Sequence, residues 1–359
     1  MNCHAAARLY VRANGTVPCN CDTGETTTLF RPRLDDLGAF DYIEDCFNGP
    51  PFVRLRERLL ASMTPIEACH SCFFFRPSEP FLKYGRDGRL RAIDQIQIES
   101  SFLCGVDCEA CVLRSTRTDP ALSALGDGPY EMPLELFHKL VDDITRAGVE
   151  VGEMAFCGRG EPLLHKDFSA MMSHARARLP RTFFSVVTSG NAPWHEGLLD
   201  VDHLSVSIDG GFPDSYEIYR KGGSLPRVLR FLETVISKRR PSAEPPSVDM
   251  PQLATQMRTR GRPIVCWKYI LFEHNDSEEE LVHAQHLARD LGVDEMMFVL
   301  THTWNRSKKY TSSAQVESLP EFKVFEGARR TFTNVNLETD NSAHWDAIGE
   351  KPRDLRFRT

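Results

Sequence analysis

The segment from about residue 90 to residue 305 alternates two kinds of hydrophobic pattern, and this alternation restricts the possible folds more than any other feature. Runs rich in β-branched and aromatic residues predict strands at residues 93–99, 149–156, 182–188, 203–208, 264–272 and 295–300. Amphipathic segments predict helices at residues 133–148, 167–179, 225–239 and 277–291. Six strands separated by helices predict an α/β fold with a parallel sheet, either doubly wound or curled into a barrel. In both forms, ligands bind at the carboxyl ends of the strands.

The distribution of cysteines is the second informative feature. The chain has 11 cysteines, of which six lie within the first 72 residues and three between residues 104 and 111. In a reducing compartment, such groups are more often metal ligands than disulfides. We expect a cytoplasmic protein, because the first residues lack the charged and then apolar pattern of a signal peptide.

Charge and hydropathy argue against two kinds of partner. The formal net charge is −7, whereas proteins that bind nucleic acid without sequence preference depend on basic patches. No uninterrupted apolar run approaches the roughly 18 residues of a membrane-spanning helix. We therefore expect neither a nucleic-acid partner nor a membrane.

Cys104, Cys108 and Cys111 form a C-x3-C-x2-C loop directly after the first predicted strand. Three thiolates on one loop can hold three irons of a cubane [4Fe–4S] cluster and leave the fourth iron open, whereas fully protein-ligated clusters use four cysteines. A structural zinc site, which also needs a fourth ligand, is the alternative. The loop by itself favours the iron–sulfur interpretation.

The second predicted strand ends in Cys157 and is followed by Gly-Arg-Gly-Glu-Pro at residues 158–162. A three-cysteine loop after the first strand and a G-E-P segment after the second resemble the radical S-adenosylmethionine (SAM) superfamily, and the inserted Arg159 lies within the family's range. The resemblance covers about residues 93–300 and implies a partial (β/α)6 TIM-like barrel at residues 90–305. It implies a SAM-binding [4Fe–4S] cluster on the three loop cysteines. It also implies that the SAM amino group is bound by Gly158, Gly160, Glu161 and Pro162.

The same resemblance predicts SAM contacts after the third and fourth strands. Ser189 and Asn191 lie in a polar turn after the third strand. Ser207, Asp209 and Arg220 lie at or after the end of the fourth strand, and Ser207 and Arg220 are expected to contact the SAM carboxylate or ribose. Arginine suits a carboxylate because it donates two parallel hydrogen bonds. The alternatives are an ordinary turn residue for Ser207 and a solvated surface charge for Arg220.

Two isolated cysteines belong to the barrel segment. Cys157, at the end of the second strand, is a candidate donor of a hydrogen atom to a substrate radical, with a buried packing role as the alternative. Cys266 lies within an apolar strand and is interpreted as a core residue.

The N-terminal cysteines resemble a second cluster module. Cys3, Cys19, Cys69 and Cys72 are similar to the ligand set of the SPASM module or its shorter twitch form, with a predicted hairpin at residues 11–17 and a predicted helix at residues 52–62 between them. This implies an auxiliary [4Fe–4S] cluster in a small domain at residues 1–85. In most relatives the module follows the barrel, whereas here it precedes it. A four-cysteine zinc knuckle is the alternative, Cys21 and Cys46 are left unassigned, and residues 306–359 are predicted as a C-terminal tail.

The resemblance implies an enzyme that cleaves SAM reductively and removes a hydrogen atom from a substrate, with flavodoxin or ferredoxin as the type of electron donor. We predict oxidation or epimerisation of a sugar-like or other small metabolite, because the cysteine module begins at residue 3 and leaves no room before it for a leader-peptide-binding segment. A maturase that oxidises or crosslinks peptide side chains is the alternative. A non-catalytic zinc-binding or electron-transfer protein is the rival from another class.

Overall fold

The computed structural model describes residues 2–3, 6–19, 28–66, 69, 75–76, 85–111, 130–241, 257–301, 303–318 and 328–333. Within these ranges, eight parallel strands form one sheet in which the spatial order follows the chain order. The strands are β2 (Arg8–Val11), β6 (Ala92–Ile98), β8 (Glu150–Phe156), β9 (Phe183–Thr188), β10 (His203–Ser207), β12 (Ile264–Leu271), β13 (Glu295–Leu300) and β14 (Ala328–Thr333).

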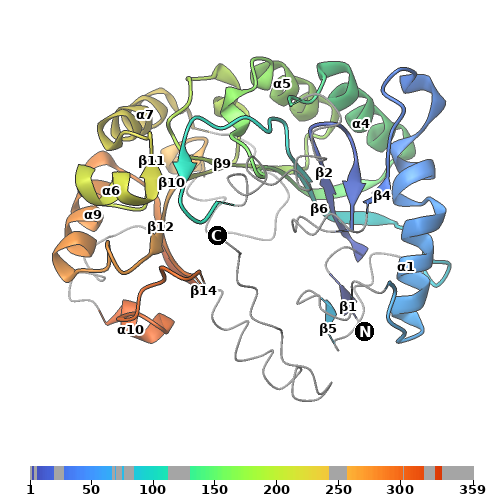
Figure 1. The fold of residues 1–359 in the computed structure, drawn as a ribbon. Helices are drawn as coiled ribbons and strands as arrows, with labels where there is room; N and C mark the ends of the chain where they lie inside the picture. Colours follow the sequence, from blue (N-terminus) through green and yellow to red (C-terminus); the bar gives the residue numbers. More distant parts are fainter. Residues whose placement is uncertain are drawn as a thin grey trace.

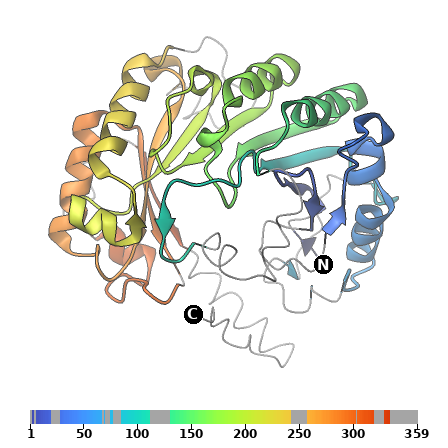
Figure 2. The ribbon, with the colours of Figure 1, turned by 45° about the horizontal axis from the view of Figure 1, so that its top comes forward.

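Helices cover one side of this sheet (Figure 1). The helices are α1 (Pro50–Leu60), α4 (Leu134–Ala147), α5 (Phe168–Arg178), α6 (Pro213–Tyr219), α7 (Leu225–Lys238), α9 (Glu278–Leu291) and α10 (Ser313–Glu317). The sheet curves as an open arc with α4, α5, α7 and α9 on its outer side (Figures 1 and 2). The parallel α/β prediction is confirmed, and the open curvature is consistent with a partial barrel.

All six predicted strands and the four predicted barrel helices are present, with ends within one or two residues of the prediction. Local signals explain the agreement. Gly148 ends α4 and Gly292 ends α9 in the left-handed conformation, with φ of 65° and 78°. The Ser277 hydroxyl accepts a hydrogen bond from the Glu280 amide and so caps the first turn of α9.

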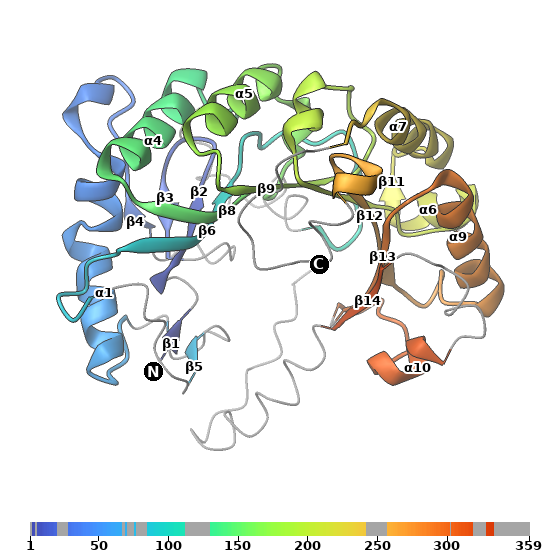
Figure 3. The same ribbon diagram turned by 180° about the vertical axis from the view of Figure 1, so that it is seen from behind.

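The sheet has two more strands than the six predicted. Strand β2 comes from the segment predicted as a separate N-terminal domain, and it pairs in parallel with β6. Strand β14 comes from the predicted C-terminal tail and pairs in parallel with β13, at the opposite edge (Figure 3). Leu9 and Val11 of β2 belong to the same buried core as the barrel strands. The predicted domain boundaries stay predictions, but the N-terminal segment and the barrel share a sheet and a core.

The predicted turn at Asn14–Gly15 is present. The Arg12 amide donates to the Thr16 carbonyl at 3.0 Å, and Gly15 has a φ of 76°, which favours glycine. Strand β3 (Val17–Pro18) then pairs with β4 (Thr28–Phe30). The predicted helix at residues 52–62 is α1, which begins at Pro50 and ends at Leu60. No helix among the described residues is long and apolar enough to cross a membrane.

Side chains alternate between the two faces of the sheet, as strand geometry requires. Alternate residues such as Leu204, Val206, Trp267 and Tyr269 are fully buried in the core. The intervening residues face the inner side of the arc and are of both kinds. The polar ones include Gln95, Gln97, Glu153, Ser185, Ser205, Ser207 and Lys268, and the apolar ones include Val187, Ile270, Met297 and Val299.

Candidate active site

The cysteine loop follows β6. It is held by the pairing of two short strands, one within the loop and one after α6. Strand β7 (Asp107–Cys108) pairs antiparallel with β11 (Arg220–Lys221), so that Cys108 lies opposite Arg220. Cys104, Cys108 and Cys111 all belong to one apolar cluster that also contains Phe272. The structure therefore gathers the three predicted cluster ligands at the carboxyl edge of the sheet, where parallel α/β folds bind ligands.

Arg220 connects this loop to the end of β10. Its Nη1 donates to Sγ of Cys108 at 3.5 Å, and its Nε and Nη2 lie 2.7 and 2.6 Å from Oδ2 of Asp209. Asp209 is fully buried, and its Oδ1 accepts a hydrogen bond from the Ile270 amide at 2.7 Å. Arg220 is thus a buried residue beside a predicted cluster ligand, not the solvated charge that was its alternative.

The cysteine thiols are held in a partly desolvated environment. Burial raises the pKa of Cys108 to about 11, although Arg220 opposes this shift. Burial also raises the pKa of Cys104. Since metal ligands are thiolates, binding a cation at this loop would release protons.

The Gly-Arg-Gly-Glu-Pro segment packs directly on the backbone of the cysteine loop. A Cβ on Gly160 would lie 2.2 Å from the carbonyl oxygen of Ser101 and 2.8 Å from that of Leu103. The Glu161 amide donates to the Leu103 carbonyl at 2.7 Å. A Cβ on Gly158 would lie 2.9 Å from Cγ of Glu99. Gly160 is therefore required for the contact between the two sequence motifs, whereas Gly158 makes room for the Glu99 side chain.

Glu161 fastens the same segment to the end of β9. Its carboxylate accepts hydrogen bonds from the amides of Leu163 and Ser189 and from the hydroxyls of Thr188 and Ser189, at 2.7–3.2 Å. Pro162 begins a short 3-10 turn, Pro162–Leu164. Glu161 and Ser189, both predicted to contact SAM, are thus bonded to each other and position the segment.

The remaining predicted SAM contacts lie on the neighbouring strand ends. The Asn191 side chain donates to the Tyr216 hydroxyl at 2.7 Å and accepts from the Ser224 amide at 2.9 Å, so it links the end of β9 to α6 and α7. Ser207 is buried on the inner side of β10, where it pairs with Lys268 of β12. SAM contacts for Asn191 and Ser207 stay predictions.

Cys157 lies at the carboxyl end of β8 and is only partly buried. Its amide donates to the Ile98 carbonyl at 3.1 Å, which continues the pairing between β6 and β8. The residue is two positions beyond Ala155 along the inner side of the strand. Its role as a hydrogen-atom donor stays a prediction.

Sequence reasoning missed a buried ion pair beside the glycine segment. Glu99 accepts a bidentate pair of hydrogen bonds from Arg159 at 3.0 Å, one from the Arg159 amide at 3.0 Å and one from the Tyr10 hydroxyl at 2.5 Å. The Glu99 and Arg159 side chains are 1% and 6% exposed. An acidic residue at the end of a predicted strand was the available signal for Glu99. Tyr10 had none, because its strand was not assigned to the sheet.

The Glu99–Arg159 pair predicts a pH-dependent stability. Burial raises the pKa of Glu99, but the hydrogen bonds and charge of Arg159 and the Tyr10 hydroxyl outweigh it and hold the pKa below its usual value. A lowered folded-state pKa contributes stability above the unfolded-state pKa, about 4.3, and this stability is lost as the pH falls through the folded-state pKa. Arg159→Met is expected to cost about 3–5 kcal/mol of unfolding free energy at neutral pH.

Because Glu99 can be protonated in acid, the cost of Arg159→Met should be smaller at about pH 4 than at neutral pH. Urea unfolding at the two pH values measures both costs. Arg178→Met is the matched control, since its ion pair with Asp142 is half-exposed and should contribute about 1 kcal/mol or less. Equal costs of Arg159→Met at both pH values would contradict the assigned charge of Glu99.

Three of the four predicted auxiliary ligands lie within the described residues, and these three come together. Cys3 and Cys69 are buried in one cluster with Leu55 and Leu59 of α1, and Cys19 packs against that cluster. Cys72 lies outside the described residues, as does Cys21. Cys46 is buried in the main core. Cys3 and Cys69 are 66 positions apart in the sequence, and the fold places them in one cluster beside α1.

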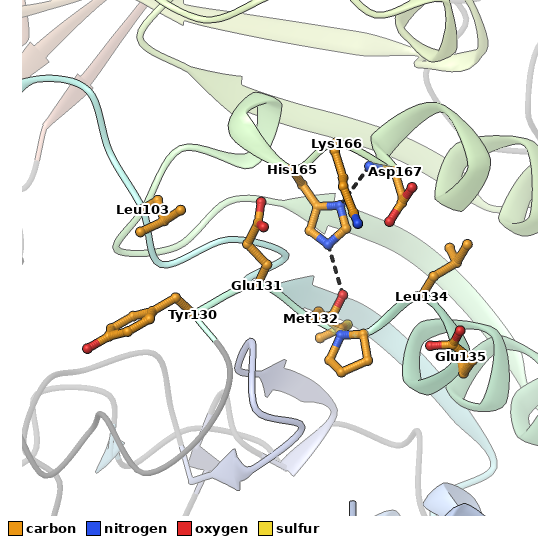
Figure 4. Close-up of a pocket in the computed structure, with 10 residues that line it drawn as sticks. Leu103, Tyr130, Glu131, Met132, Leu134, Glu135, His165, Lys166 and Asp167 are labelled. Carbon is orange, nitrogen blue, oxygen red and sulfur yellow. Dashed lines mark hydrogen bonds between the residues drawn. The ribbon is translucent and has the colours of Figure 1, made fainter.

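A cavity of about 590 Å³ opens next to the cysteine loop (Figure 4). Leu103 is the residue of the loop that lines it, and the other lining residues precede α4, belong to its first turn or lead into α5. His165 is fixed there: the Asp167 amide donates to Nδ1, so Nε2 carries the proton and donates to the Met132 carbonyl at 2.8 Å. None of the predicted cluster or SAM ligands lines this cavity, and the candidate site lies elsewhere.

Comparison with known proteins agrees with the site. Residues 98–245 match the model of the Radical SAM superfamily. No curated protein matches the chain. The match to the superfamily model covers the cysteine loop, the glycine segment and Arg220. It supports a radical SAM domain at residues 98–245, which are 148 of the 359 residues of the chain.

The matched solved structures share little sequence with this chain. SuiB from Streptococcus suis is 12% identical with a TM-score of 0.47, over 71% of this chain and 52% of that one. SuiB bound to the precursor peptide SuiA is 11% identical with a TM-score of 0.48, over 90% and 70%. A radical SAM methyltransferase from Sphaerobacter thermophilus is 12% identical with a TM-score of 0.44, over 68% and 67%. The chain thus matches about half the length of the first of these.

Proposed function

We propose that this protein is a radical SAM enzyme that cleaves SAM reductively and removes a hydrogen atom from a polar small-molecule substrate. The contact at Gly160 carries this proposal, because it brings the glycine segment onto the backbone of the cysteine loop. The cysteine loop and the glycine segment then form one site at the carboxyl edge of the sheet.

The residues present fit the group that the superfamily implies. Three thiols on one loop supply the soft ligands of an iron–sulfur cluster, and the close packing of Gly160 on Ser101 and Leu103 holds the glycine segment beside that loop. When bound, the cluster supplies the electron that splits SAM into methionine and a 5′-deoxyadenosyl radical, which takes a hydrogen atom from the substrate. Arg220 stabilises the thiolate of Cys108 by its charge and hydrogen bond. Glu161 holds the glycine segment in place.

The proposal is tested by anaerobic reconstitution with iron and sulfide, followed by incubation with SAM and dithionite. We expect iron and sulfide in equal amounts and 5′-deoxyadenosine together with methionine. A protein that binds zinc but no iron, and forms no 5′-deoxyadenosine, would support the non-catalytic rival instead.

We further propose that the N-terminal cysteines hold an auxiliary [4Fe–4S] cluster. The gathering of Cys3, Cys19 and Cys69 beside α1 supports this assignment, and Cys72 is the expected fourth ligand. A cluster with four protein ligands suits electron transfer, which favours a net oxidation of the substrate. Cys3→Ala/Cys69→Ala is expected to remove about four irons per chain, the content of one cubane, while the SAM-binding cluster stays. Unchanged iron would contradict this assignment.

The inner side of the sheet supports a substrate rich in hydrogen-bonding groups. Parallel barrels are usually filled by bulky branched side chains. Here Glu153 accepts hydrogen bonds from Gln95 at 2.6 Å and from Ser185 at 2.5 Å. Lys268 also lies on this side, and burial lowers its pKa. Such a lining favours a sugar-like substrate over an apolar one.

A peptide maturase is the second candidate. It is supported by the resemblance of the N-terminal cysteines to the auxiliary-cluster module, and not by the side chains on the inner side of the sheet. The two candidates differ in substrate size, so they are separated by a screen for substrate-dependent 5′-deoxyadenosine formation. Aminocyclitols and hexose derivatives are one set, and short peptides are the other. Stimulation by peptides alone would overturn the small-molecule proposal but leave the radical mechanism intact.

A further inference from the structure

Three potential metal ligands of different types meet on the inner side of the sheet, away from the cysteine loop. His203, Cys266 and Glu295 each offer one ligand atom, and these atoms all lie within 4.8 Å of one another. The sequence interpretation of Cys266 as a simple core residue does not explain its two polar neighbours.

Strand register explains why these residues meet. His203 begins β10, Glu295 begins β13, and Cys266 lies opposite Glu295 on the intervening strand β12. Their chain neighbours Leu204, Val265, Trp267 and Met296 are buried in the core beneath the helices. Because side chains alternate along a strand, the three residues face the inner side together.

The surroundings of the three ligand atoms are poorly solvated. Cys266 is fully buried, and the side chains of His203 and Glu295 are 12% and 8% exposed. Nε2 of His203 lies 2.9 Å from Oε2 of Glu295. The two charges of a divalent cation would be balanced by one thiolate and one carboxylate, while the imidazole stays neutral. The buried cation and its three ligands would then carry no net charge. The cation would replace the hydrogen bond between His203 and Glu295.

We propose that His203, Cys266 and Glu295 bind zinc. Thiolate, imidazole and carboxylate are the three ligand types that zinc takes in proteins, and three protein ligands leave a fourth position for water. The site lies at the amino ends of β10 and β13, whereas the cysteine loop follows the carboxyl end of β6. Zinc here joins three adjacent strands and stabilises the sheet, and it is separate from the radical chemistry.

The test begins with the wild-type protein, purified with zinc in the medium and then reconstituted with iron. Zinc content and zinc X-ray absorption are measured on the same sample. We expect one sulfur at about 2.3 Å and nitrogen or oxygen ligands at about 2.0–2.1 Å, with the scattering signature of imidazole. A shell of four sulfurs would instead place zinc at the N-terminal cysteines and overturn the proposal, as would a protein with no zinc.

Substitutions of the three residues test whether the zinc ion is bound at this site. Cys266→Ala and His203→Ala are expected to lose about one equivalent of zinc while the iron content stays unchanged. Cys46→Ala is the matched control, because Cys46 is a buried thiol in the main core. Glu295→Gln preserves the size of the side chain and keeps the test valid if the smaller residues prevent folding. Zinc retained by all three site variants would overturn the proposal.

Discussion

Replacement of Cys104, Cys108 and Cys111 by alanine is expected to remove one of two clusters and abolish 5′-deoxyadenosine formation. The three thiols are the predicted cluster ligands of the loop, and they lie in one cluster with Phe272, with Cys108 bonded to Arg220. Iron should fall by about half, because each cubane holds four irons. Iron, sulfide and 5′-deoxyadenosine are measured on the same anaerobic preparations of variant and wild type.

Cys46→Ala is the control for the loss of a buried thiol, since Cys46 lies in the main core and is not a predicted ligand of either cluster. It should keep both clusters and the full yield of 5′-deoxyadenosine. If the triple variant loses all its iron, the N-terminal cysteines hold no cluster, and the argument for a net oxidation fails. If the triple variant still cleaves SAM, the assigned radical site is wrong.

Replacement of Gly160 by alanine is expected to have the second largest effect. A Cβ would lie 2.2 Å from the Ser101 carbonyl oxygen and 2.7 Å from the Phe102 carbonyl carbon. Both are backbone atoms, so the overlap can be relieved only by moving the cysteine loop away from the glycine segment. We expect a cost of about 1–3 kcal/mol in unfolding free energy and a much larger loss of SAM cleavage, because the two halves of the site separate.

Gly105→Ala is the matched control. Gly105 lies in the same loop, beside Cys104, but a Cβ there would meet no heavy atom within 4 Å. This variant should keep its SAM-binding cluster and its 5′-deoxyadenosine yield. Equal losses in the two variants would mean that the loop tolerates no side chain for reasons unrelated to the Gly160 contact. An active Gly160→Ala variant would contradict the proposed joining of the two motifs.

Much of the barrel could be predicted from the sequence because the signals there are local. The alternation of β-branched runs with amphipathic segments gave the six inner strands and their helices, and Gly148 and Gly292 marked helix ends through their left-handed backbone. The spacing of Cys104, Cys108 and Cys111 predicted a metal-binding loop for the same reason. Residues close in sequence on one loop are necessarily close in space.

The edges of the sheet could not be predicted in this way. Strand β2 has only four residues, and β14 lies in a polar, weakly patterned segment. Strands as short as β2 carry too little periodicity to be recognised alone. The positions of β2 and β14 are determined by the edges of β6 and β13, whose backbone groups form hydrogen bonds with them.

The contacts within the site were decided by tertiary structure. The resemblance predicted SAM contacts for Arg220, Asp209, Glu161 and Ser189. In the structure, Arg220 forms an ion pair with Asp209, and the Ser189 amide donates a hydrogen bond to Glu161. Sequence by itself determined the elements, the cysteine loop and the position of the glycine segment. Only the fold decided that Arg220 reaches Cys108 and that Tyr10 reaches Glu99, because these pairs are separated by 112 and 89 residues. Parallel strand order brings such distant residues together, and no local pattern records it.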